Sequence, residues 1–156
     1  MKTLLPINNI HEHIVSLANS NPKKTALLTC NAEGDIVSEI TYQELLQQIE
    51  AAAVYLHDLG LKKGDRAAVA FRNSSELLIL SWAAWATGIV TVPMDVKRDT
   101  GELYQYKMRL NKVKLLIAQK GVLDSIDKAY LQDVEVREFS GFPAKHPPQS
   151  VFFPVK

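Results

Sequence analysis

Residues 64–95 read GDRAAVAFRNSSELLILSWAAWATGIVTVPMD, and this stretch predicts a strand, a helix and a second strand in immediate succession. The run 67–71 is apolar throughout and has the length of a strand, which is typical of a strand covered on both faces in a parallel sheet. The run 89–92 is the next predicted strand, and Pro93 closes it. Parallel strands joined by a helix form a βαβ crossover, so the sequence predicts an α/β fold.

Local signals mark both ends of the helix in this unit. Asn73 offers a side-chain oxygen to the first turn, and Glu76 three residues later completes a capping box. Gly88 is the expected stop of a helix over 74–87, because glycine adopts the left-handed conformation that ends a helix. The helix is apolar on nearly all sides and includes Trp82 and Trp85. We therefore expect it to be buried between layers or against a neighbouring domain.

Further elements are predicted before this unit. They are, in order, a short amphipathic helix that begins at residue 10, an antiparallel hairpin of strands 26–30 and 36–40, and a helix that ends at Gly60. Thr41 and Glu44 have the spacing of a capping box at the start of that last helix.

The sequence after the unit predicts a helix, a strand, a helix and a strand, over 100–111, 113–118, 122–129 and 134–139. In the first of these helices we expect Asp99 to be the cap, Glu102 its reciprocal partner, and the inner stripe to consist of Leu103, Tyr106 and Leu110. The last strand alternates apolar and charged residues, which indicates an edge position.

The elements together predict a mostly parallel sheet flanked by helices, with an antiparallel hairpin near the N-terminus. We expect residues 1–140 to form one α/β unit and the proline-rich tail, 141–156, to lead into a further subdomain.

Composition argues against several classes of function. The chain has 156 residues, 47% of them hydrophobic, and 18 Lys and Arg against 17 Asp and Glu, for a net charge of +1. This balance provides no field that would attract nucleic acid. The longest apolar run, 77–86, is too short to span a bilayer, and the start lacks the pattern of a signal peptide. The single cysteine, Cys30, allows no intrachain disulfide, and we expect it to be a buried structural thiol in a cytoplasmic protein.

Few residues suggest chemistry of their own. His11 and His13 have the spacing of two metal ligands on a strand, but on the predicted helix they point to different faces. Asp65 and Arg66 suit a turn that leads into a strand. Residues 93–95, Pro-Met-Asp, follow a predicted parallel strand at its carboxyl end, where open α/β sheets bind ligands. From these patterns we assign no catalytic, cofactor-binding or metal-binding residue.

Two segments resemble signatures of a known family. Residues 41–45, TYQEL, resemble the motif Thr-Tyr-x-Glu-Leu, and residues 85–95 resemble Leu-Lys-Ala-Gly-x-x-Tyr-Val-Pro-Leu-Asp. With these motifs in order and at matching spacing over residues 10–118, the chain resembles the early part of the adenylate-forming enzymes: acyl-CoA synthetases, peptide-synthetase adenylation domains and luciferases. Ala86-Thr87 replaces the usual Lys-Ala, and residues 96–99 replace a proline-rich segment, so the resemblance leaves the acyl substrate open.

The resemblance implies a parent enzyme that uses ATP and Mg²⁺ to convert a carboxylic acid to an acyl-adenylate and then transfers the acyl group to a thiol such as coenzyme A. In that family a loop rich in Ser, Thr and Gly and ending in Lys-Gly handles ATP. Residues 120–156 contain no such loop, and the closest segment, 140–145, lacks the repeated glycines that a phosphate cradle needs.

The prediction is therefore an N-terminal fragment of an AMP-forming ligase. We expect the fragment to be inactive alone, to bind no cofactor itself, and to need the remainder of the parent enzyme as its partner. Two alternatives stay open. In the first, the chain is a non-catalytic interaction module that uses the apolar helix around Trp82 and Trp85 as its contact surface. In the second, it is a flavodoxin-like nucleotide binder.

Overall fold

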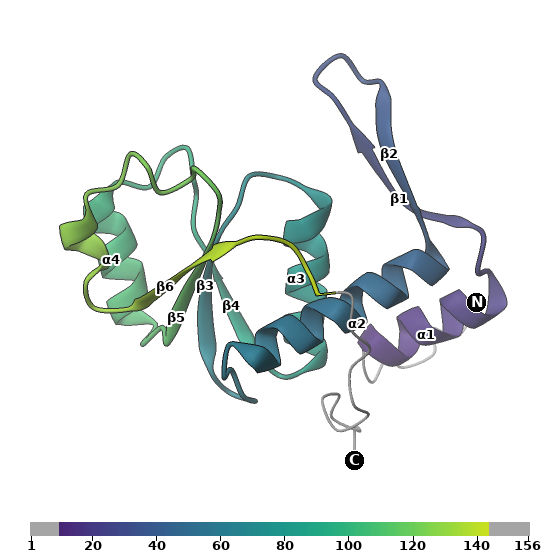
Figure 1. Ribbon diagram of the computed structural model, residues 1–156, viewed down its shortest axis with the longest axis horizontal. Helices are drawn as coiled ribbons and strands as arrows, with labels where there is room; N and C mark the ends of the chain where they lie inside the picture. Colours follow the sequence, from purple (N-terminus) through teal and green to yellow (C-terminus); the bar gives the residue numbers. More distant parts are fainter. Residues whose placement is uncertain (1–9, 144–156) are drawn as a thin grey trace, which may run out of the picture.

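The computed structural model describes residues 10–143, and within them the strands form two separate sheets (Figure 1). The larger sheet has the order β4-β3-β5-β6, and its paired strands are all parallel. Its strands are β3 (Arg66–Ala70), β4 (Val90–Pro93), β5 (Leu115–Gln119) and β6 (Glu135–Phe139). The smaller sheet is an antiparallel hairpin of β1 (Thr25–Cys30) and β2 (Ile36–Thr41), which projects from the body of the molecule. The predicted α/β class, the hairpin and the edge position of the last strand are confirmed.

Helices cover the parallel sheet on both faces (Figure 1). On one face lie α1 (Ile10–Ser20), α2 (Tyr42–Asp58) and α3 (Ser75–Ala86), and on the other lie α4 (Gly101–Leu110) and the short 3-10 helix η1 (Lys128–Leu131). Within residues 10–143, no helix has the length and hydrophobicity that crossing a membrane requires.

The central strand β3 shows why its sequence is apolar at every position. Ala67 and Val69 pack into the core beneath α2 and α3, whereas Ala68 and Ala70 pack into the core beneath α4. All four side chains are at most 3% exposed. A strand between two layers of helices has no polar face, so the absence of alternation is a consequence of its position.

The helix α3 begins one residue later than predicted. Ser74, and not Asn73, is the N-cap, and its hydroxyl accepts a hydrogen bond from the backbone N–H of Leu77 at 3.3 Å. Gly88 follows the helix with a φ of +73°, which confirms the predicted stop. Burial is also less complete than expected, because Trp85 is 52% exposed.

The capping box at the start of α2 is confirmed. The Thr41 side chain accepts a hydrogen bond from the Glu44 backbone N–H, and the Glu44 carboxylate accepts one from the Thr41 N–H at 2.8 Å. The hydrogen bond from the Thr41 backbone N–H, and then one from the Thr41 hydroxyl at 2.9 Å, lower the pKa of the Glu44 carboxyl. The box therefore fixes the point at which β2 turns into α2.

The helix α4 is rotated from its predicted orientation. Its N-cap is Thr100, which accepts from the Leu103 N–H, so the expected cap Asp99 is wrong. Tyr104 and Met108 face the sheet, and the predicted inner residues are exposed: Leu103 (37%), Tyr106 (60%) and Leu110 (65%). Both stripes are apolar, so hydrophobicity alone did not distinguish them. The predicted partner Glu102 instead accepts a hydrogen bond from the Tyr130 hydroxyl at 3.4 Å.

The predicted helix over 122–129 is wrong. Val122 is buried, but the segment continues as turns before η1, whose N-cap Asp127 accepts from the Ala129 N–H at 2.9 Å. Short polar side chains such as Asp124 and Ser125 compete with helical hydrogen bonding and favour turns.

The buried thiol was also predicted wrongly, because Cys30 is exposed. It lies next to the turn of the β1–β2 hairpin, opposite Ile36, where the hairpin extends beyond the helices. At the other end of the described chain, Phe142 packs edge-on against Phe139 and Tyr55. The proposed boundary at residue 140 stays a prediction, and most of the tail, residues 144–156, lies outside the described residues.

Candidate functional site

A cleft of about 720 Å³ lies at the carboxyl ends of β3 and β4. Residues 71–73 after β3, and 93–98 at and after the end of β4, form much of its wall, together with Leu77 of α3 and Lys107 of α4. The position agrees with the prediction that residues 93–95 would lie at a ligand-binding edge of the sheet. Its volume is within the range of small-molecule sites.

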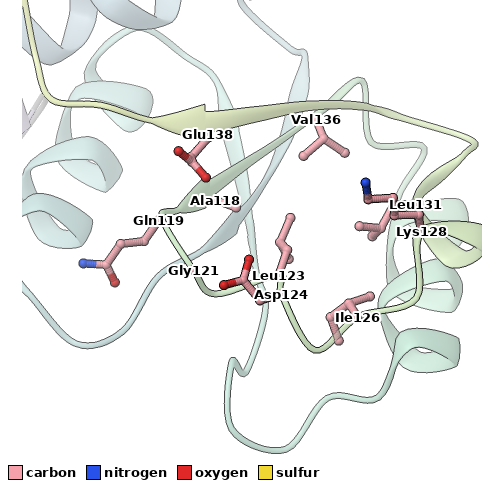
Figure 2. Close-up of a pocket in the computed structure, with 10 residues that line it drawn as sticks. All are labelled: Ala118, Gln119, Gly121, Leu123, Asp124, Ile126, Lys128, Leu131, Val136 and Glu138. Atoms are coloured by element: carbon pink, nitrogen blue, oxygen red, sulfur yellow. The ribbon is translucent and has the colours of Figure 1, made fainter.

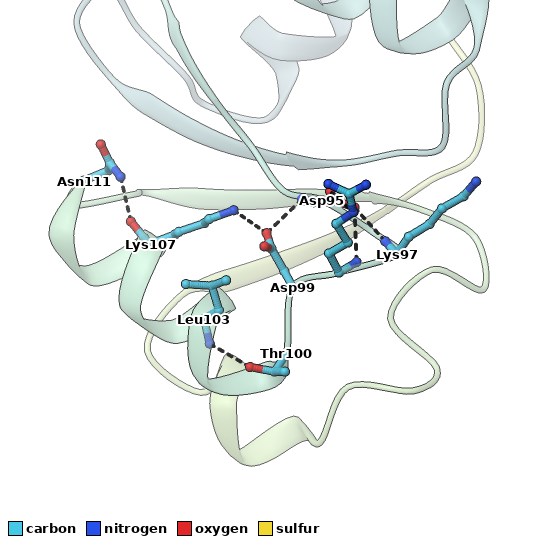
Figure 3. A network of polar contacts seen from close by, with 8 residues as sticks. Asp95, Lys97, Asp99, Thr100, Leu103, Lys107 and Asn111 are labelled. Atoms are coloured by element: carbon cyan, nitrogen blue, oxygen red, sulfur yellow. Dashed lines mark hydrogen bonds and ion pairs between the residues drawn. The ribbon is translucent and has the colours of Figure 1, made fainter.

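The turn after β4 is organised around the Asp95 carboxylate (Figure 3). One of its oxygens accepts hydrogen bonds from the backbone N–H groups of Lys97 at 3.0 Å and Arg98 at 3.1 Å. These bonds, with that from Lys97 the larger cause, lower the pKa of Asp95. The carboxylate thus holds the turn that presents residues 96–98 to the cleft.

A second carboxylate fastens this turn to α4. Asp99 accepts a hydrogen bond from the Asp95 backbone N–H at 2.8 Å and forms an ion pair with the Lys107 ammonium (Figure 3). The Asp99 side chain is only 4% exposed. Burial first, and then the neighbouring charges of Asp99 and Asp95, raise the pKa of Tyr104 to about 12. The raised pKa keeps the Tyr104 hydroxyl protonated at neutral pH.

The remaining charges at the cleft are cationic. Arg72, Lys97 and Arg98 are exposed, and Arg98 makes only a 3.9 Å ion pair with Asp95. The Arg72 backbone N–H donates to the side-chain oxygen of Gln119 at 3.2 Å, which ties this wall to β5. Such a cleft is suited to an anionic group, a carboxylate or a phosphate.

The other candidates lie elsewhere. Asp65 and Arg66 are at the amino end of β3, opposite the cleft. Asp65 accepts from the Lys114 ammonium at 2.7 Å and from the Lys62 N–H at 2.8 Å, and the Lys114 hydrogen bond chiefly lowers its pKa. The Asp65 carboxylate therefore fixes a turn, as interpreted from sequence. His11 and His13 lie on α1, and residues 10–143 contain no group of three His, Cys, Asp or Glu side chains placed to hold a metal ion.

Sequence reasoning found one wall of the cleft but missed the other. Arg72 follows directly after the apolar run of β3, so the rule that drew attention to Asp95 applied to it equally. Lys107 had no comparable signal, because its place depends on how α4 is rotated.

The family model of the AMP-binding enzymes matches residues 16–147 of this chain. The chain belongs to the AMP-binding enzyme family. The match includes the βαβ unit, both resembling motifs and the cleft, and it continues past residue 118, where the resemblance of the motifs ends.

Curated relatives of this AMP-binding family chain are ligases. The crotonobetaine/carnitine–CoA ligase of Salmonella paratyphi A is 28% identical over 138 residues, which cover 88% of this chain but 25% of the relative. The enzyme of the same name from Escherichia coli O1:K1 is 32% identical over 81 residues. The chain thus spans about a quarter or less of the length of these relatives.

Solved structures share the fold. The N-terminal subdomain of NpsA from Klebsiella oxytoca superimposes with a TM-score of 0.73 at 22% identity, covering 94% of this chain and 35% of that one. A fatty acyl CoA synthetase of Mycobacterium tuberculosis gives a TM-score of 0.73 at 22% identity, over 90% and 30% of the two chains. These neighbours confirm the predicted α/β architecture of this AMP-binding family chain.

Proposed function

We propose that this chain is the first part of an AMP-forming acid–thiol ligase. The whole enzyme would join a carboxylic acid to AMP at the expense of ATP, release pyrophosphate, and transfer the acyl group to a thiol such as coenzyme A. The observation that carries the proposal is the family match over residues 16–147, supported by relatives that are named as CoA ligases.

In such an enzyme the chain would supply the first part of the α/β framework and one cleft at the edge of its sheet. Its cationic cleft is suited to the carboxylate and phosphate groups that such a reaction involves. We do not expect the cleft to hold ATP or Mg²⁺ by itself, because residues 10–143 offer no clustered metal ligands and the sequence has no glycine-rich phosphate loop. The remaining machinery would come from the rest of the parent enzyme.

The alternatives are not favoured. A flavodoxin-like nucleotide binder would not explain the match to the AMP-binding enzymes over most of the chain. A non-catalytic module would retain the fold but none of the activity, so an activity measurement separates it from the ligase.

The direct experiment is acid-dependent exchange of labelled pyrophosphate into ATP. We expect exchange by the protein translated from the complete reading frame, tested with a panel of carboxylic acids, and none by the 156-residue chain. A reading frame that stops at Lys156, or a folded full-length protein that shows no exchange with any acid, would favour the non-catalytic module.

A further inference from the structure

A second cavity, of about 650 Å³, lies under β6 on the α4 side of the sheet (Figure 2). Its walls are the end of β5, the turns that follow Gly121, the helix η1 and the underside of β6. Gly121 has a φ of +74°, and this turn directs the chain back beneath the sheet. The cavity therefore exists because residues 122–127 form turns and not the expected helix.

The register of β6 determines which of its side chains face the cavity. Val136 pairs with Leu116 and Glu138 pairs with Ala118, so both project on the face that carries this second core. Val136 is nevertheless 37% exposed, because it faces the cavity and not a packed neighbour. Leu123, Ile126 and Leu131 complete an apolar wall around it.

Carboxylates gather at one end of this wall. Asp124 and Glu138 both line the cavity, and Figure 2 shows their carboxylates on the side of Gln119. Neither is paired with a residue in the described part of the chain, and both residues are exposed. Lys128 lies on the opposite side in the same view, beside Leu131. Positive charge is therefore favoured at the Glu138 end and disfavoured at the Lys128 end.

We propose that this cavity binds a small molecule that combines an apolar body with one ammonium group. The apolar body lies against Val136, Leu123, Ile126 and Leu131, and the ammonium lies between Asp124 and Glu138. The volume is that of ordinary small-molecule sites, which join an apolar lining to a few polar groups that set orientation. This inference does not depend on the proposed ligase activity.

The test uses the 156-residue chain and hexylammonium as the probe. NMR titration should give saturable shifts of the backbone amides of Ala118, Gly121 and Val136, with a dissociation constant on the order of 1 mM. Hexanoate, which has the same chain length and the opposite charge, should bind at least about tenfold more weakly.

Two double variants distinguish binding in the cavity from nonspecific electrostatic attraction to the protein. Asp124→Asn combined with Glu138→Gln should weaken hexylammonium binding about tenfold. Glu33→Gln combined with Glu135→Gln makes the same change in net charge away from the cavity and should leave affinity unchanged, because Glu33 is in the hairpin turn and Glu135 projects from the other face of β6. Equal binding of hexanoate, unaltered affinity in the first pair, or shifts confined to other parts of the chain would overturn the proposal. All four positions are exposed, so unaltered melting temperatures should confirm that each variant folds.

Discussion

Replacing Trp82 with lysine is expected to lower the free energy of unfolding by about 3 kcal/mol. Trp82 lies on α3 and packs against the core formed by α1, α2, α3 and the parallel sheet. The substitution removes a large apolar side chain and introduces an ammonium next to that apolar core, which is unfavourable for a charge. Urea unfolding followed by circular dichroism measures the change directly.

Trp85 provides a matched control on the same helix. It is 52% exposed, and its indole N–H donates to the Thr91 hydroxyl at 3.2 Å. Trp85→Lys makes the same chemical change in a solvated place, so its cost should stay below about 1 kcal/mol. Similar losses for the two variants would contradict the described orientation of α3.

Replacing Asp99 with alanine is expected to cost about 2 kcal/mol and to disorder the wall of the cleft. The Asp99 side chain is 4% exposed, and it joins the Asp95 backbone N–H to the Lys107 ammonium. Removing it leaves a backbone donor and a partly buried cation without their acceptor. Urea unfolding gives the cost, and amide hydrogen exchange at residues 95–98 reports the loosened turn.

Arg98→Ala is the appropriate comparison for this variant. The Arg98 side chain is 88% exposed, and its ion pair with Asp95 is long at 3.9 Å. Its removal should change stability by less than about 0.5 kcal/mol and leave exchange in the turn unaltered. If Asp99→Ala proved equally harmless, the network would not be what holds the cleft together.

The parts of the fold that sequence predicted correctly have strong local signals. The βαβ unit from β3 to β4 has a fully apolar run in β3 and a glycine stop at Gly88, and the burial of β3 on both faces left little ambiguity. The capping box of Thr41 and Glu44 likewise depends on residues close in sequence. Such features need no knowledge of the tertiary structure.

The errors arose where tertiary packing chose between similar local options. On α4, the stripes that include Tyr104 and Tyr106 are both apolar, and contact with the sheet selected the first. Gly101 at the start of α4 lies against the ring of Tyr130, and a Cβ there would meet its Cδ2 atom at 2.3 Å. This approach between segments distant in sequence orients the helix, and no local pattern reveals it.

The candidate site was predictable in position but not in composition. The end of a parallel strand directed attention to Asp95, whereas the contribution of Lys107 and the buried state of Asp99 depend on the rotation of α4. The second cavity could not be expected at all, because a helix was predicted where turns create it.

We propose that this chain forms part of the framework of an AMP-binding enzyme and binds no nucleotide by itself. The most direct test is the melting temperature of the 156-residue chain as ATP and Mg²⁺ are added. A ligand stabilises a protein only in proportion to its binding to the folded state, so we predict no saturable change. A saturable rise of about 5 °C or more would contradict the account, because it would show that these residues hold the nucleotide alone.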